Sequence, residues 1–139
     1  MSKKKTRMFV LSGTEVGSFF IPGNPVPAER VRRGRGNRFY TPDKSREYRK
    51  HVQKHLPKEI KKMEPITNPT LVCFFCRGDR RQTDIDNLVK AIQDALLGIV
   101  YTDDSDVRFV LGGKLLSPDA NCEVGVAVTI LSQAKVEVA

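Results

Sequence analysis

Residues 69–104 read PTLVCFFCRGDRRQTDIDNLVKAIQDALLGIVYTDD, and this stretch decides the fold. Its first part, 69–77, is apolar on both faces and lies between a proline and a charged loop, which is typical of a central strand. After Asp86, apolar residues recur at the spacing of one buried helix face, and Gly98 ends the pattern. The residues on that face are Leu88, Ile92, Ala95, Leu96 and Ile99. The stretch therefore predicts a strand, a loop and a helix.

The flanking sequence predicts further elements on both sides. Residues 7–21 contain two short apolar runs separated by SGTEVG, which favours a hairpin. Prolines and glycines across 22–40 predict a basic loop without regular elements. A helix should begin at Thr41 or Asp43, stop near Pro57 and continue after a kink. Two strands follow Asp104, VRFVLGGKLL and CEVGVAVTIL, and the second places Val124, Val126, Val128 and Ile130 on one side.

These elements indicate one α+β domain over residues 1–139. We expect a mixed sheet with two main helices packed mainly on one face. The length of 139 residues suits a single domain, and a hydrophobic content of 40% is enough for a packed core. We expect the two ends, 1–6 and 133–139, to be mobile tails.

The chain is strongly basic. It contains 24 Lys and Arg against 16 Asp and Glu, for a formal charge of +8. This balance favours a polyanionic partner, which is nucleic acid or an anionic membrane surface, although a well-solvated or ribosome-bound protein has the same charge. No basic amphipathic helix with aromatic anchors supports a membrane partner, and no run approaches the ~20 apolar residues of a membrane span. Without a signal peptide, we expect a cytoplasmic or nucleoid-associated protein with no small-molecule substrate.

The three cysteines give no metal-site signal. Cys73 and Cys76 match the C-x-x-C spacing, but in a strand their thiols point to opposite faces. We therefore expect these two and Cys122 to be small core residues. His51 and His55 have the i, i+4 spacing of zinc ligands, but no third ligand is near in sequence, so we interpret them as exposed helix residues.

The acidic residues of this basic chain gather around the predicted helix. In extended backbone Asp84 and Asp86 point the same way, and Lys90 follows Asp86 by one helical turn. An antiparallel return of the chain can bring Asp103 or Asp104 back beside them. We interpret Asp94 as an ion-pair partner of Lys90. The structural alternative is that Asp84 and Asp86 are helix caps and the later pair is a turn.

Carboxylates held together repel one another unless a cation is present. Mg²⁺ binds oxygen ligands and uses a few carboxylates together with substrate phosphates, and Mn²⁺ can take its place. Such a site activates water and neutralises charge on a phosphate, while a lysine supplies a fixed positive charge. The predicted metal ligands and catalytic carboxylates are Asp84 and Asp86 together with Asp103 or Asp104, and the predicted catalytic lysine is Lys90.

Arginines flank the acidic motif in two groups. Five lie on the basic loop, where they suit contacts with DNA phosphates: Arg30, Arg32, Arg33, Arg35 and Arg38. The others directly precede the acidic motif, where we expect them beside the cleaved phosphate: Arg77, Arg80 and Arg81.

With these residues assembled, DIDNLVKAIQDALLGIVYTDDSDV resembles the RusA family of Holliday junction resolvases. The segments IPGNPVPAERVRR and RFYTPDKSREYR are also similar to that family, and the resemblance spans residues 18 to 131. It implies a small homodimeric, Mg²⁺-dependent endonuclease that cuts four-way DNA junctions symmetrically. Its catalytic aspartates correspond to Asp84, Asp86 and Asp104, with Asp103 beside them, and its lysine to Lys90. A shortened stretch after the helix leaves open which of the adjacent pair binds metal, and we favour Asp104.

Two other functions fit parts of the sequence. One is a Mg²⁺ nuclease that prefers other branched DNA, such as flaps or D-loops. The other is a basic nucleic-acid-binding protein without catalysis, against which the acidic set and Lys90 argue. For a junction resolvase, paired cuts on a nearly two-fold symmetric substrate favour a homodimer. Its interface should use apolar strand residues from LVCFFC and VGVAVTIL.

Overall fold

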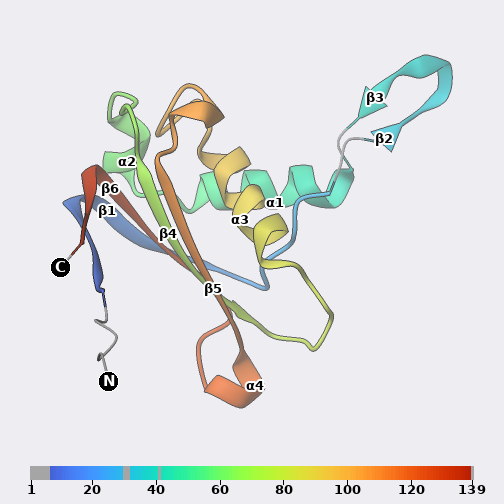
Figure 1. Ribbon diagram of the computed structural model, residues 1–139. Coiled ribbons are helices and arrows are strands. Elements are labelled where there is room, and N and C mark those ends of the chain that lie inside the picture. Colours follow the sequence, from blue (N-terminus) through green and yellow to red (C-terminus); the bar gives the residue numbers. More distant parts are fainter. Residues whose placement is uncertain (1–6, 30–31, 41, 139) are drawn as a thin grey trace, which may run out of the picture.

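The computed structural model describes residues 7–29, 32–40 and 42–138, and it is built on a mixed four-stranded sheet (Figure 1). The strands of this sheet are β1 (Phe9–Pro22), β4 (Thr70–Arg77), β5 (Phe109–Leu116) and β6 (Gly125–Val138). Their spatial order is β1-β6-β4-β5. β6 runs antiparallel to both β1 and β4, whereas β5 runs parallel to β4. The predicted central position of β4 is confirmed.

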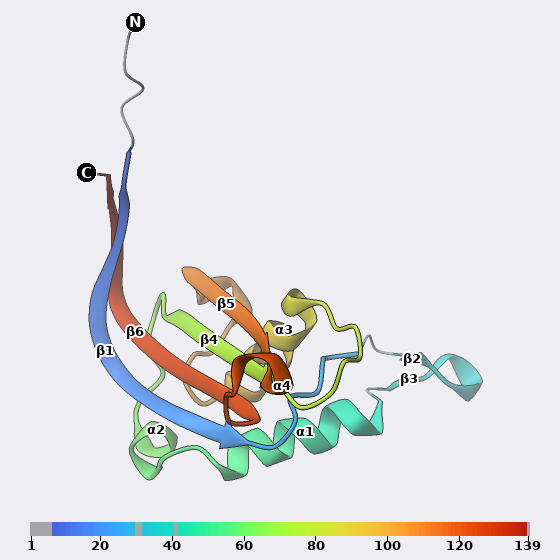
Figure 2. The same ribbon diagram turned by 90° about the horizontal axis from the view of Figure 1, so that it is seen from below.

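Helices α1 (Asp43–Lys54), α2 (Lys58–Lys62) and α3 (Ile85–Leu96) cover one face of this sheet (Figure 2). The short α4 (Ser117–Ala120) lies in the β5–β6 connection, beyond the end of β5, and the 3₁₀ turns are η1 (Arg35–Asn37) and η2 (Asp104–Asp106). The break between α1 and α2 at Pro57 is the predicted kink. With α3 linking the parallel strands β4 and β5, the single domain has the expected α+β class.

Alternating sheet residues form the core together with the helices. Leu71, Cys73 and Phe75 of β4 are buried, and so are Val126, Val128 and Ile130 of β6. They meet the predicted apolar face of α3, of which Leu88, Ile92, Ala95 and Leu96 are all fully buried. The periodicities of 2 and 3.6 in the sequence therefore identified the core correctly.

Two glycines set the position of α3. Gly112 on β5 faces the helix, and a Cβ there would lie 2.9 Å from Cγ2 of Val89 and 3.3 Å from Cγ1 of Ile85. The start of α3 therefore packs against the β5 backbone at a distance that only glycine allows. Gly98 has φ +85°, in the left-handed region, and directly follows the C-cap Leu97, which confirms the predicted helix end.

Both ends of the chain differ from the expectation. The predicted hairpin over 7–21 is wrong, because β1 is one long strand that pairs with β6. The register shifts between Ser12 and Thr14 and again between Glu15 and Gly17, so the SGTEVG segment forms irregularities within the strand instead of a turn. At the other end, β6 continues to Val138, which pairs with Phe9, where we expected a mobile tail over 133–139. The expected tail over 1–6 lies outside the described residues.

The basic loop also contains regular structure. Residues Arg32–Arg33 (β2) pair with Phe39–Tyr40 (β3) in a small hairpin, in contrast to the expected irregular loop. Gly36 at its tip has φ +70°, which allows the tight reversal. Figures 1 and 2 show this hairpin projecting from the end of α1, away from the four-stranded sheet.

The cysteines do not all behave as core residues. Cys76, near the end of β4, forms a disulfide with Cys122, just before β6. The antiparallel register explains the pairing, because Cys76 lies opposite Gly125 and the Cα atoms of the two cysteines are 6.3 Å apart. The prediction of buried core residues holds for Cys73, a free thiol, and for Cys76, but not for Cys122, which is only partly buried. Burial raises the pKa of Cys73 to about 12.

In the described part of the chain, no helix combines the length and the apolar character that crossing a bilayer requires.

Candidate active site

The acidic motif lies at the beginning of α3. Asp84 is the N-cap residue, with an extended backbone at φ −72° and ψ 135°, and Asp86 lies in the first helical turn. We expected Asp84 and Asp86 to lie together in extended backbone. Only Asp84 does, because the helix begins at Ile85. The side chain of Asp84, at the N-cap position, makes no capping hydrogen bond to the first turn of the helix. Asp86 Oδ1 instead accepts a hydrogen bond from the neighbouring Asn87 N–H at 3.0 Å.

Lys90 connects the acidic residues of α3 to the chain that follows the helix. Its Nζ donates to Asp94 Oδ1 at 2.7 Å and to Asp104 Oδ2 at 3.3 Å. These contacts raise the pKa of Lys90, Asp94 contributing most and Asp104 less, so the ammonium stays charged at neutral pH. The predicted Lys90–Asp94 ion pair is confirmed. The chain returns Asp104 to Lys90, whereas its predicted position beside Asp84 and Asp86 stays a prediction.

The adjacent carboxylates Asp103 and Asp104 have different surroundings. Asp103 Oδ1 accepts hydrogen bonds from the backbone N–H and the hydroxyl of Ser105, both at 2.9 Å, and so caps η2. These bonds hold the pKa of Asp103 below its usual range. Asp104 instead faces Lys90. The preference for Asp104 as the functional member of the pair gains support from this division of roles.

Tyr101 is a second contact of Asp104, and the sequence reasoning missed it. Its ring is fully buried, and its hydroxyl donates to the Gln93 carbonyl at 2.6 Å and lies 3.4 Å from Asp104 Oδ1. Burial, together with the negative charge of Asp104, raises the pKa of Tyr101. The sequence offered one indication of this contact. A buried tyrosine hydroxyl requires a hydrogen-bond partner, and Asp104 lies only three residues after Tyr101.

No preformed metal cage is visible. Among the described residues, no three His, Cys, Asp or Glu side chains lie close enough together to hold a metal ion. Asp84 and Asp86 are exposed at the helix start, with no ion-pair partner among the described residues, whereas Asp104 is held one turn further along by Lys90. The carboxylates thus lie along one edge of α3 and do not converge on one point.

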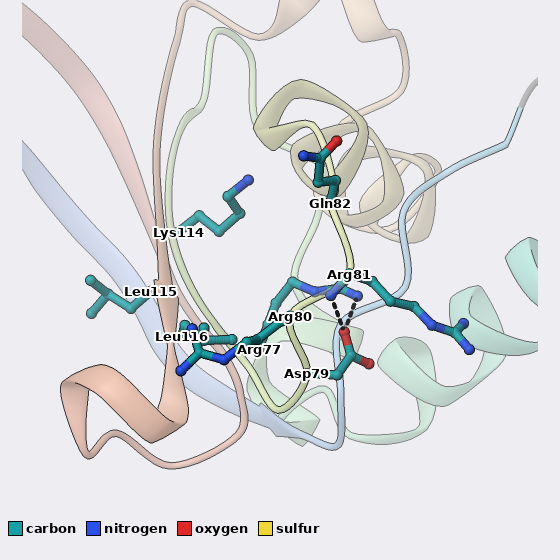
Figure 3. Close-up of a pocket in the computed structure, with 8 residues that line it drawn as sticks. All are labelled: Arg77, Asp79, Arg80, Arg81, Gln82, Lys114, Leu115 and Leu116. Carbon is teal, nitrogen blue, oxygen red and sulfur yellow. Dashed lines mark hydrogen bonds and ion pairs between the residues drawn. The ribbon is translucent and has the colours of Figure 1, made fainter.

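The arginines that precede the motif point in different directions. Arg77 is only 5% exposed and donates to the Pro25 carbonyl and to Asp79, so it is not the surface residue that we expected. Arg80 and Arg81 are exposed, and Figure 3 shows Arg80 extending toward α4 and Arg81 extending to the opposite side. Only Arg80 and Arg81 are therefore open to a large ligand.

The root of the basic loop is fixed to the same site. The Ala28 N–H donates to the Asn87 carbonyl at 2.9 Å, and the Glu29 N–H donates to Ser45 Oγ at 3.0 Å. Because Asn87 follows Asp86, the loop begins beside the acidic motif. Arg35 and Arg38 are exposed on the hairpin, the backbone alone is described for Arg32 and Arg33, and Arg30 lies outside the described residues.

Comparison with known proteins agrees with this arrangement. The family model "Endodeoxyribonuclease RusA" matches residues 22–130, which include the loop, the acidic motif and most of the sheet. The chain is 30% identical over 102 residues to the crossover junction endodeoxyribonuclease rusA of Enterobacteria phage HK97. That match covers 69% of this chain and 83% of the phage protein. The chain therefore belongs to the RusA family of endodeoxyribonucleases.

Proposed function

We propose that this protein is a divalent-metal-dependent endonuclease that binds four-way DNA junctions and resolves them by paired, symmetric cleavage. The observation that carries the proposal is the contact of Lys90 with Asp104. It joins two parts of the motif that are 14 residues apart in the sequence. The hydrogen bond from the Ala28 N–H to the Asn87 carbonyl holds the basic loop beside the start of the same motif. Family membership and the activity named for the phage relative support the same function.

The acidic residues fit a magnesium ion by their donor chemistry, although they form no closed cage. Mg²⁺ keeps several waters and is bound in nucleic-acid enzymes through one or two carboxylates plus substrate phosphates. Asp84 and Asp86, exposed and without ion-pair partners among the described residues, would hold it, with Asp104 completing the set and Asp103 beside it. Bound there, Mg²⁺ or Mn²⁺ supplies positive charge at the phosphate and lowers the pKa of a water.

The chain's own residues supply binding and orientation. Lys90 keeps its positive charge next to the motif and can neutralise charge that develops on the phosphate. Tyr101 and Lys90 together fix Asp104. Arg80 and Arg81, with the arginines of the hairpin, contact the DNA backbone, while Arg77 supports the loop from inside.

The sheet face without helices supports a homodimer. Successive strand residues alternate between faces, so Phe74 lies opposite the core residues Cys73 and Phe75. Phe74 is 59% exposed, and its ring covers Gly113 on β5. Phe20, Leu111 and Leu115 are also exposed. We propose that this apolar face pairs with a second copy, which provides two acidic sites for two cuts.

A cleavage assay on labelled branched DNA tests the function. Four-way junctions, flaps and D-loops are compared with and without Mg²⁺ or Mn²⁺, using Asp84→Asn and Asp86→Asn variants. We expect metal-dependent paired cuts in the junction, loss of cutting in both variants and unchanged binding, because removing negative charge does not weaken attraction to phosphates. Glu137→Gln, at an exposed site on β6, is the control.

The same panel separates the alternatives. Preferred cutting of flaps or D-loops identifies a different branched substrate, and binding without cutting under any metal identifies a non-catalytic protein. Strong cleavage by Asp84→Asn or Asp86→Asn in Mg²⁺ refutes the ligand assignment. We place the activity in the cytoplasm, associated with the nucleoid, because its substrate is DNA.

A further inference from the structure

A pocket of about 290 Å³ opens next to the acidic motif, between the β4–α3 loop and the end of β5 (Figure 3). Its lining includes Arg77, Arg80, Gln82, Lys114, Leu115 and Leu116. The pocket is tied to the motif by Lys114, whose Nζ donates to the carbonyl of Thr83, the residue before Asp84. The pocket therefore lies within reach of a DNA strand that is bound at Asp84.

The pocket wall is positively charged. Arg77 is buried, and its Nε has no hydrogen-bond partner in the described part of the chain, so its charge is only partly compensated by Asp79 and the Pro25 carbonyl. Arg80 pairs with Asp119 on α4 at 3.0 Å, but both side chains are exposed, at 71% and 60%. Such an exposed pair contributes little and can exchange for a phosphate. Lys114 retains further N–H donors beyond the one that Thr83 uses.

The same wall also has apolar and amide groups, which a bare phosphate does not require. Leu115 and Leu116 are contributed by the end of β5, and Gln82 by the loop. The Gln82 amide has both donors and an acceptor, as does the edge of a nucleobase. Figure 3 shows Lys114 on β5 and Gln82 on the β4–α3 loop, both above Arg80 and Arg77 in this view. Cations, an apolar surface and an amide together match a nucleotide.

The size of the pocket limits the ligand to a single unit. Small-molecule sites occupy roughly 300–1,000 Å³, so this pocket is at the lower end of the range. One base can enter, whereas a base pair or a duplex cannot. Enzymes that modify a base take single nucleotides into such pockets, and bases that are already unpaired enter most readily. The crossing point of a branched DNA offers bases of this kind.

We propose that this pocket binds one unpaired nucleotide of the strand that lies across Asp84 and Asp86. The base lies against Leu116, Gln82 contacts its edge, and its phosphate lies near Arg80 and Lys114. This inference rests on the proposed function, because it takes a branched DNA as the substrate. It makes Gln82 a residue that determines at which base the enzyme acts.

The first test scans a four-way junction with single abasic sites. For the wild-type protein, removing one particular base near the cleaved bond should lower binding several-fold, while other positions have little effect. Gln82→Ala should bind the intact junction several-fold more weakly and show no further loss at that position. Gln133→Ala, the same change at an exposed site on β6, should behave as wild type. An equal loss at every position, or the same profile for wild type and Gln82→Ala, overturns the proposal.

The second test does not depend on cleavage or on a junction. The ¹⁵N-labelled full chain is titrated with a four-nucleotide single strand, with deoxycytidine 5′-monophosphate and with inorganic phosphate. We expect the oligonucleotide and the mononucleotide to shift the Gln82 side-chain amide and the backbone of Lys114 and Leu116, and phosphate alone to leave Gln82 unshifted. Equal shifts with phosphate would make the pocket an anion site and reject the nucleotide. If no junction is ever cut, the proposed function fails while this titration still decides the pocket.

Discussion

At the scale of single residues, Lys90 has a different environment from a surface helix lysine. It contacts one carboxylate on its own helix and a second one that the chain brings back after the helix. Lys90 itself is half exposed, so these pairs contribute little to folding, within about 1 kcal/mol. Lys90 therefore matters more as a positive charge beside the acidic motif than as a contributor to the free energy of unfolding.

Replacing Lys90 separates these two effects. Lys90→Ala should lower cleavage by roughly 100-fold or more, as the loss of one charge-stabilising donor does, with a change in unfolding free energy of about 1 kcal/mol or less. Lys90→Arg should not restore the full rate, because a planar guanidinium places its charge elsewhere. Single-turnover rates and urea unfolding measure the two quantities. Near-normal cleavage by Lys90→Ala would reduce this residue to a structural one; Lys135→Ala on β6 is the control.

The buried thiol of Cys73 predicts a pH dependence of stability. Its pKa is raised from 9.0 to about 12 by burial, so between these values the unfolded chain binds fewer protons than the folded one. Stability should therefore fall as pH rises from 9 toward 12, by at most about 1.4 kcal/mol for each pH unit from this group. Urea unfolding at pH 8, 10 and 11 checks this. Cys73→Ala should show a shallower decline, and identical slopes would contradict the assignment.

At the scale of elements, the approach of α3 to β5 positions the acidic motif. Gly112→Ala would place a methyl 2.9 Å from Val89, at the helix turn that follows Asp84 and Asp86. We expect a loss of stability of about 1–3 kcal/mol and a larger fractional loss of cleavage, because the helix start must move. Ser12→Ala, at an exposed position on β1 away from the helix, is the control. Cleavage by Gly112→Ala at the wild-type rate would show that this contact does not set the site.

The arginines of the β2–β3 hairpin should contribute to the salt dependence of junction binding. Replacing Arg32, Arg33 and Arg35 together should weaken junction binding and flatten its dependence on salt. Each lost phosphate contact should lower the slope of log K against log salt by roughly 0.9. The slope is obtained from binding constants measured between roughly 50 and 200 mM salt, because phosphate contacts weaken over this range. A triple variant with the wild-type slope would mean that the hairpin does not contact the DNA backbone.

At the scale of the whole molecule, the open sheet face predicts the assembly. The wild-type protein should sediment as a dimer of about twice 15.6 kDa at micromolar concentration. Phe74→Glu should shift it to monomer, because a charge cannot be buried without a partner. Phe9→Glu, at a side chain that is 72% exposed near the end of β1, should remain dimeric. A wild-type monomer that still makes paired cuts would defeat the symmetry argument.

Local patterns predicted much of this molecule, and contacts between distant segments account for the errors. The buried face of α3, the central place of β4 and the Lys90–Asp94 pair all follow from periodicity or short spacing. The long β1 was missed because its glycines lie at register shifts, which look like a turn until β6 pairs with it. The burial of Arg77 depends on the Pro25 carbonyl, 52 residues away, which no local pattern indicates.

The Cys76–Cys122 disulfide has a consequence for a cut chain. The two cysteines are 46 residues apart, and the segment between them contains the whole acidic motif, Lys90, Tyr101 and Lys114. Closing a loop of this length stabilises the folded state by about 4 kcal/mol in the chain-entropy model. A protease that nicks exposed α4 would therefore produce two fragments that stay covalently joined. They would migrate as one species on a gel until a reductant is added, so the disulfide would keep β6 attached to the fragment that contains the candidate site.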